Sequence, residues 1–483
     1  MMNTKRVVIL AFVWLSVGVF AQQSDRMRIW LNEGTSQSFP VNSVDSVTFG
    51  SGWEEEVGST WTAPPVSNRC VPLMLTSLER DRVRLSNAFS KKCFSAIYKT
   101  ADTTLDRGDF FFSPMGLQMA LAMCANGASE GAKEEILSAL GFSGETALED
   151  MNTYYHKIYK YLASPCDSVR MEFPSALWVR GGAPVDGRFS DVAKRTFYAT
   201  IGGLDSSSDS VSVKSTVDDW VRTVTHGQLD QSYADVSSDE GLALHSTSYM
   251  LGRWWTQLMP RTFFDYEWNE KAMCVALSEY RMYTFTGFAD TDQYQAMEVR
   301  FGPYEYLCGI NITNKEQIRC VNLLSDTSLY NHAYSMILVQ PKEGYAMEDV
   351  MENIQWEALP LVPFPCWVRF PYVDFSRTYE WKDFLGEMGI KKLFEEPYAA
   401  VDGTISRFSQ ECKAYWNERG FGVTDSSTVY PPASANGAMM AELPERGMLD
   451  AKKTTLVVFR DNLSGLVLFM GRVKDLRNRV VSE

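Results

Sequence analysis

The pentapeptide Gly127-Ala128-Ser129-Glu130-Gly131 is the stretch of this chain whose residue types and spacing best fit catalysis. It matches the G-x-S-x-G pattern, in which an exposed serine attacks a carbonyl carbon. That chemistry requires a strand before the serine and a helix after it. The preceding residues, MALAMCAN, have helical character and predict that Ser129 lies in a turn between two helices. A serine hydrolase using Ser129 is therefore the weaker alternative for this chain.

Other residues that carry out chemistry are sparse. No HExxH or CxxC motif and no Gly-rich phosphate loop after a strand occurs, so the sequence predicts no metal, no cofactor and no enzyme activity. The nine cysteines are scattered without a recurring spacing and do not form a disulfide framework. The net charge of −14, with no basic stripe, disfavours a nucleic-acid or anionic-membrane partner. We expect ordinary core or surface roles for the four histidines, at positions 156, 226, 245 and 332.

The segment from Gln410 to Arg472 reads as a strand, a long polar loop and a hairpin. The loop after Gly420 is rich in Ser, Thr, Ala, Pro and Gly and contains nothing that would anchor a packed core. Two unbroken apolar runs follow it, TLVVF (455–459) and LVLFM (466–470), with turn residues between them. Runs of this kind are typical of strands buried on both faces. The sequence therefore predicts an exposed, cleavable loop held between buried strands.

The elements upstream are those of a large α+β scaffold. Leu85, Phe89, Cys93 and Ile97 recur at every fourth residue and predict one buried helix face, with Asn87 off it. Three phenylalanines at 110–112 predict a buried strand, after which Ser113 is the expected N-cap of a helix that has Pro114 at its first position.

Several blocks in one order resemble the serpins, the serine protease inhibitor family. The resemblance covers about residues 75–478 and is to a secreted, bacterial-type member. It implies a serpin fold of class α+β, with three β-sheets, about eight or nine surrounding helices and an exposed reactive loop near the C-terminus. The matching blocks are 109–142, 173–205, 215–231, 368–396 and the terminal stretch that runs from Asn417-Glu418-Arg419-Gly420 to RDNLSGLVLFMGRV.

The resemblance implies a suicide-substrate inhibitor of a serine or cysteine endopeptidase. In this family the target protease cuts the loop, which then inserts into the central sheet and traps the enzyme. Counting forward from Gly420 places the cut near Ser434-Ala435, and counting back from the hairpin places it near Met439, Met440 and Ala441, so the loop is longer than usual. Small or unbranched residues at both places favour an elastase-like or subtilisin-like target. We also expect the protein to be a monomer.

Two regions depart from the family pattern. The hinge keeps Glu418 and Gly420, but residues that inhibitors usually keep small are Phe421, Gly422, Val423, Thr424, Asp425 and Ser426. Burying Asp425 without a partner would cost at least a few kcal/mol. These departures favour the alternative of a non-inhibitory serpin-fold binding protein, or of a loop-cleaved substrate. In the sheet-opening region, the resemblance places Ser113, Gly116, Ser246, Gln410 and, at the top of the sheet, Trp254.

The N-terminus predicts secretion. Lys5-Arg6, the apolar run 7–20 and Ala21 form a signal peptide, 1–21, so we expect a secreted protein, periplasmic or extracellular. Residues 22–74 form a short extension and linker, in which MRIWL and VNSVDSVTF are expected to pair as a hairpin around Asn32-Glu33-Gly34. Residues 75–483 are the serpin domain.

Overall fold

The structure is a computed structural model of the 483-residue chain. The chain divides into two compact units, Met1–Thr60 and Trp61–Glu483. The expected boundary near residue 74 remains a prediction. The structure describes residues 26–30, 36–40, 75–104, 108–163, 169–204, 210–232, 234, 241–254, 258–263, 272–277, 285–301, 334–371, 373–417, 420–422, 447–450 and 454–473.

The first unit contains an antiparallel hairpin of β1 (Arg26–Trp30) and β2 (Ser36–Pro40). The expected hairpin therefore exists, but its second strand is SQSFP rather than VNSVDSVTF. The strands pair from Arg26–Pro40 to Trp30–Ser36, so only five residues connect them. The run VNSVDSVTF lies outside the described residues.

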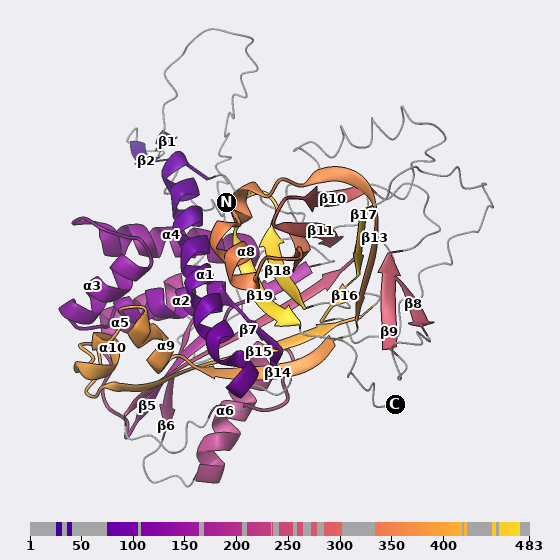
Figure 1. Ribbon diagram of the computed structural model, residues 1–483. Coiled ribbons are helices and arrows are strands. Elements are labelled where there is room, and N and C mark those ends of the chain that lie inside the picture. The colour runs from indigo at the N-terminus through magenta and orange to yellow at the C-terminus, as the bar shows by residue number, and fades with distance from the viewer. Residues whose placement is uncertain are drawn as a thin grey trace, which may run out of the picture. The chain divides into compact units, whose positions relative to one another are not determined.

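In the second unit, the described residues contain nine α-helices, which agrees with the eight or nine expected (Figure 1). Apart from Gln118, helix α2 is apolar on all sides, and all of its residues are buried, as expected for a helix at the centre of a core. The helices are α1 (Ser77–Thr104), α2 (Pro114–Ala125), α3 (Glu130–Ala139), α4 (Ala147–Leu162), α5 (Gly187–Thr196), α6 (Ser210–Val224), α8 (Met347–Asn353), α9 (Lys382–Glu387) and α10 (Lys392–Glu395), with a 3₁₀ turn, η3 (Trp356–Ala358).

Helix α1 buries Phe89, Cys93 and Ile97 as predicted, but two neighbours differ from expectation. Leu85 is 43% exposed, and Asn87, expected off the buried face, is 2% exposed. The Asn87 amide donates to the Gly465 carbonyl at 2.9 Å and its oxygen accepts from the Val467 N–H at 3.0 Å. Asn87 is buried because it satisfies the backbone of the turn that precedes the last strand.

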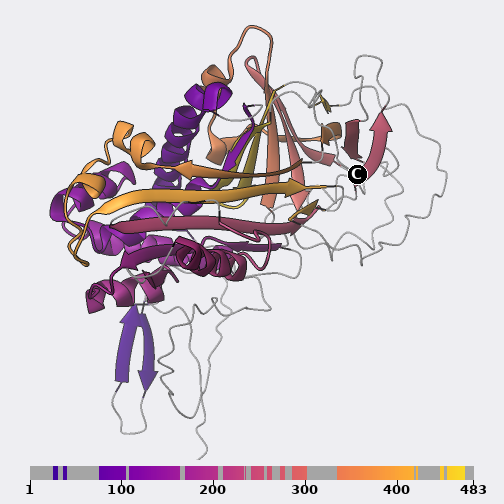
Figure 2. The same cartoon turned by 90° about the horizontal axis from the view of Figure 1, so that it is seen from below.

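A seven-stranded sheet forms the centre of the unit. Its two longest strands, β7 and β15, run parallel and pair directly from Leu242–Ile405 to Ser248–Cys412. Figure 2 shows these strands side by side. Helix α6 packs on one face of the sheet through Val213, Val217 and Trp220. The strand order is β14 (Val373–Glu380), β15 (Ile405–Trp416), β16 (Gly420–Phe421), β7 (Leu242–Arg253), β5 (Ser175–Arg180), β6 (Thr200–Leu204), with β4 (Val169–Glu172) on β7.

The other two expected sheets are joined through one strand. Strand β13 (Val362–Pro371) pairs with β10 through its first half and with β9 and β17 through its second, so that ten strands form one continuous sheet. The predicted strands at 455–459 and 466–470 are confirmed as β18 and β19. The order is β3 (Phe110–Phe112), β19 (Val467–Val473), β18 (Thr455–Asp461), β12 (Tyr334–Pro341), β11 (Tyr294–Phe301), β10 (Phe285–Asp290), β13, β9 (Ala272–Leu277), β8 (Leu258–Phe263), with β17 (Gly447–Asp450) on β13.

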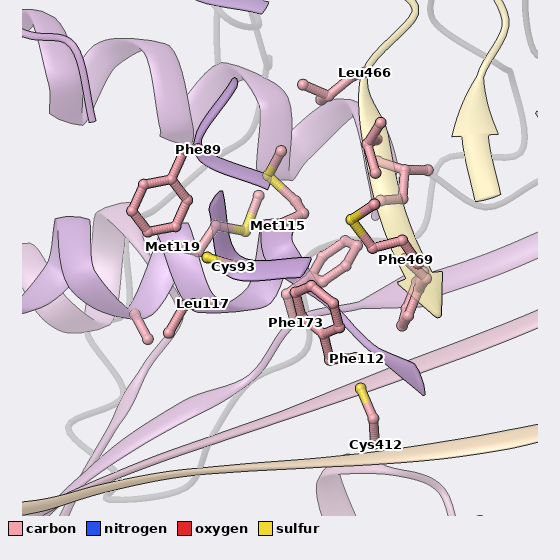
Figure 3. Close-up of a cluster of buried hydrophobic side chains, with 14 of the residues drawn as sticks. Phe89, Cys93, Phe112, Met115, Leu117, Met119, Phe173, Cys412, Leu466 and Phe469 are labelled. Carbon is pink, nitrogen blue, oxygen red and sulfur yellow. The ribbon is translucent and has the colours of Figure 1, made fainter. Parts of the chain in front are cut away.

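The main core lies between the two sheets and helices α1 and α2. Figure 3 shows Met115 and Met119 of α2, Phe112 of β3 and Phe469 of β19 gathered in it, with Cys412 of β15 pointing toward them. Cys412 therefore marks the face of β15 that looks into the core, and its neighbours in sequence point to the opposite face, toward α6.

Candidate functional site

The candidate site is the line along which β7 and β15 pair, which we call the seam. At its upper end the chain leaves β15 at Trp416, turns back and places β16 between the two strands. Phe421 pairs with Trp416 on one side and with Gly252 on the other, antiparallel to both. Below β16, β7 and β15 pair with each other without an intervening strand. The seam is thus open to a third strand at its top and closed beneath it.

The turn into β16 is stabilised by local hydrogen bonds. The Asn417 N–H donates to the Gly420 carbonyl at 3.0 Å, and the Gly420 N–H donates to Asn417 Oδ1 at 3.2 Å. From above, the Trp254 indole N–H donates to the Asn417 carbonyl at 2.7 Å. Trp254, predicted at the top of the sheet, therefore lies against the start of the hinge and is separate from the other sheet-opening residues.

Phe421 is buried in an aromatic cluster that joins the two sheets. Its side chain is 2% exposed, and its ring centroid lies 4.6 Å from Phe459, 5.8 Å from Phe111 and 5.9 Å from Trp416. The resemblance implies a small residue at this position, and the cluster supplies the room that the larger ring needs. The first residues of the predicted exposed loop are therefore already part of the sheet.

Gly422 ends β16 in a conformation that favours glycine. Its φ is +69°, and a Cβ at this position would lie 2.5 Å from the Met250 carbonyl oxygen. Its N–H donates to the Tyr415 carbonyl at 2.8 Å. The glycine lets the chain pass close to β7, and no sequence signal that we used identified this need.

Replacing Gly422 with alanine is expected to lower the free energy of unfolding by about 3 kcal/mol. The left-handed conformation accounts for about 1–2 kcal/mol of this, and the contact with the Met250 carbonyl for about 1–3 kcal/mol. Gly182→Ala is the matched control, because Gly182 has φ +65° with nothing within 4 Å of an added Cβ. Chemical denaturation of both variants checks this, and equal losses would show that β7 does not confine Gly422.

The remaining sheet-opening residues meet midway down the seam. Ser113 caps α2 by accepting from the Gly116 N–H at 3.0 Å, and its hydroxyl donates to the Leu468 carbonyl at 2.9 Å. The Gln410 amide donates to the Ser113 carbonyl at 2.8 Å. Ser246, opposite Gln410 on β7, donates to the Gly116 carbonyl at a long 3.5 Å. The structure thus brings these four residues together across α2, β7 and β15.

Sequence reasoning missed Ser248, which completes this group. A Cβ on Gly116 would collide with the Ser248 hydroxyl and would lie 3.4 Å from Gln410 Nε2. The hydroxyl of Ser248 therefore occupies the space that a side chain at position 116 would fill. A serine on a strand carries no local signal for this role, because its partner is more than a hundred residues away in sequence.

Gly116→Ser is expected to destabilise the protein by about 2 kcal/mol, because it overfills this space. Adding Ser248→Ala should recover most of the loss, since the colliding oxygen is then absent. Thermal unfolding of the two single variants and the double variant measures the coupling. If the stability change of the double variant equals the sum of the two single changes, the Ser248 hydroxyl does not compete with a side chain at position 116.

The alternative nucleophile is differently placed. Ser129 lies in the turn between α2 and α3, where its Oγ accepts from the Ala132 N–H at 3.1 Å and donates to the Glu396 carboxylate. Helix α2, rather than a strand, precedes it, so the nucleophile-elbow geometry is not met. Within the described residues, no cluster of His, Cys, Asp and Glu is arranged to hold a metal ion.

Part of the predicted site lies outside the described residues. It comprises Glu418, Val423, Thr424, Asp425 and Ser426 of the hinge, together with the cleavage candidates Ser434, Ala435, Met439, Met440 and Ala441. In the part of the chain that the structure describes, no helix is long and apolar enough to cross a membrane.

Known proteins share this architecture. Residues 84–476 match the family model described as Serpin (serine protease inhibitor). The chain is 22% identical over 383 residues to mouse Neuroserpin, covering 76% of this chain and 85% of that protein. It is 21% identical over 424 residues to wheat Serpin-Z2A, covering 83% and 98%.

Solved structures agree with this match. Native tengpin, a thermophilic serpin, aligns with a TM-score of 0.62 and 17% identity over 85% of this chain and 96% of its own. Human thyroxine-binding globulin aligns with a TM-score of 0.62 and 16% identity over 82% and 99%. The curated relatives named here are eukaryotic, so a bacterial-type subgroup stays a prediction, whereas the serpin fold is confirmed. With a family match over most of its length and a fold shared with solved members, the chain belongs to the serpin family.

Proposed function

We propose that this serpin is a secreted suicide-substrate inhibitor of a serine or cysteine endopeptidase, with an elastase-like or subtilisin-like target. The observation that supports it best is β16, a strand already started between β7 and β15 at the top of an otherwise closed seam. A cut in the loop between β16 and β17 would free the chain after Gly422 to continue in the same register. The proposed cut remains near Ser434-Ala435 or Met439–Ala441.

The register of β16 predicts which loop residues would meet which seam residues. Each step along the loop moves one residue back along both neighbouring strands. Ser427 lies six residues past Phe421, and Gln410 and Ser246 lie six residues before Trp416 and Gly252. Ser427 would therefore pair between Gln410 and Ser246. Gln410 and Ser246 are themselves paired in the closed seam, so β15 and β7 give the same register for the loop. A single inserted strand could therefore pair with both.

The same register locates Asp425. It would enter between Cys412 and Ser248 on the core-facing side, because it shares the face of Phe421. The Ser248 hydroxyl has no hydrogen-bond partner within the described residues and can donate to a carboxylate. One such bond offsets part of the cost of burying Asp425, which would otherwise slow insertion.

A specific observation also favours a second function. Phe421 is anchored in the aromatic cluster, and an anchored hinge suits a serpin that binds without inhibiting, or one that is cleaved as a substrate. Thyroxine-binding globulin, which was solved in complex with thyroxine, has the same fold. This alternative requires that the cut loop stay outside the seam.

Incubation with elastase-like and subtilisin-like proteases separates the two functions. An inhibitor gives a covalent complex on a denaturing gel, and its cleaved form melts at a higher temperature than the intact form. Clean cleavage with an unchanged melting temperature would support the second function. Ser129→Ala should leave complex formation unaltered, whereas loss of an ester-hydrolysing activity in that variant would support the hydrolase.

A further inference from the structure

A buried acid and base face each other across the seam. His245 of β7 and Glu411 of β15 lie on the side covered by α6, with His245 Nε2 3.5 Å from Glu411 Oε2. Their side chains are 0% and 2% exposed. The Trp220 ring of α6 lies over the imidazole at 5.0 Å between centroids. The two ionisable residues thus lie on opposite sides of the seam, on the two strands that an inserted strand would separate.

The surroundings keep Glu411 ionised. Burial raises the pKa of Glu411, but His245 and hydrogen bonds from Ser232 Oγ (2.8 Å) and the Ala234 N–H (2.7 Å) lower it, and the result lies below the ordinary 4.5. Its stabilising contribution is present above the unfolded-state pKa and is lost only as the pH falls through the lower folded-state pKa. Glu411 therefore stays negative through the mildly acidic range.

His245 has few other partners. Within the described residues neither of its ring nitrogens makes a hydrogen bond, so the carboxylate of Glu411 is the charge that it faces. On α6, Asp218 binds Lys214 at 2.8 Å and the Ser232 N–H. On β15, Lys413 lies 3.7 Å from Asp374, and on β5 the residue opposite His245 is Ala176. A positive charge on His245 would therefore be stabilised mainly by the carboxylate of Glu411.

Opening the seam must separate this pair. Neighbouring strands lie about 4.8 Å apart, so a strand inserted between β7 and β15 would add about that distance between the two side chains. At a buried site, a charged pair at 3.5 Å attracts far more strongly than a neutral imidazole and a carboxylate do. The energy needed to open the seam therefore depends on whether His245 carries a proton.

We propose that His245 and Glu411 form a proton-dependent latch that holds the seam closed in mildly acidic surroundings and releases it near neutral pH. Histidine side chains ordinarily change charge between about pH 5 and 8. Because the closed seam keeps the ion pair that the open seam loses, the closed form binds the proton more tightly and is favoured as the pH falls. The consequence for inhibition rests on the proposed function, and the latch itself does not.

Hydrogen exchange of the intact protein measures the latch without any protease. We expect backbone amides in 405–416 to exchange about tenfold more slowly at about pH 5.5 than at about pH 7.5, after correction for intrinsic rates. His245→Gln and Glu411→Gln should each abolish this difference, and the double variant should change nothing further. His226→Gln is the control, because His226 pairs with Glu172 of β4 at 3.1 Å, away from the seam.

Two results would overturn the latch. One is an equal corrected exchange rate at the two pH values in the unaltered protein, and the other is a tenfold difference that persists in His245→Gln. If glutamine at position 245 prevents folding, the comparison of Glu411→Gln (difference lost) with Glu411→Asp (difference kept in part) decides the same question. Failure to form protease complexes would reject the proposed inhibitor and leave this exchange result standing, so the two failures are distinguishable.

Discussion

Replacing Phe421 with alanine is expected to lower the free energy of unfolding of the intact protein by about 3–4 kcal/mol, the usual cost of removing a buried aromatic ring. The ring contacts Phe111, Trp416 and Phe459, so its loss leaves a cavity where the two sheets meet. Denaturant unfolding measures the loss. Trp416 stacks on Phe421 at 5.9 Å, so its fluorescence should change in the folded state as well.

The matched control is Phe375→Ala on β14. Phe375 is only partly buried, so we expect a loss of about 1 kcal/mol. A Phe421→Ala variant no less stable than this control would mean that β16 is not held in the seam. That result would remove the main support for insertion in the register of β16.

Placing a charge on the core-facing side of the inserting strand is expected to abolish inhibition. Ser427→Asp would bring a second carboxylate between Gln410 and Ser246, which already donate to the carbonyls of Ser113 and Gly116. Burying a carboxylate whose neighbours' donors are already used costs at least a few kcal/mol. Since about 1.4 kcal/mol changes a rate tenfold, the ratio of covalent complex to cleaved product should fall at least tenfold. Densitometry of a denaturing gel gives this ratio directly.

Thr424→Asp controls for the charge itself. In the same register Thr424 pairs with Lys413, on the face toward α6, where a carboxylate meets a cation. We expect this variant to form complexes at close to the original ratio. Equal losses in the two variants would show that the loop enters in another register or remains outside the seam.

The sequence was most informative where the role of a residue depends on the residues next to it in the chain. The apolar runs at 455–459 and 466–470, the three phenylalanines of β3 and the Ser113-Pro114 helix start all formed as predicted, because local periodicity and capping determine them. Sequence resemblance brought Ser113, Gly116, Ser246 and Gln410 together as a group, although none of these residues marks the group alone.

What the sequence could not predict depends on contacts between distant residues. Asn87 looked like a surface residue until the turn at Gly465 supplied its partners. Ser248 and the pair His245 and Glu411 gain their meaning from strands far apart in the chain. Phe421 was judged from the family's preference for small residues, whereas the aromatic cluster around it comes from four separate strands. The pattern of side chains along one segment contains no information about contacts with segments far away in the sequence.

The loop is attached to two different sheets, through β16 at one end and β17 at the other, with twenty-four residues between Gly422 and Gly447. Strand β17 lies parallel to β13 and has no neighbour in the seven-stranded sheet. If the cut loop inserts as proposed, only the upstream fragment can extend along β15, at about 3.3 Å per residue. The two new chain ends would therefore separate by tens of ångströms. A fluorophore pair with one dye on each side of the cut would lose energy transfer on insertion, so that single inserted molecules could be told from intact ones.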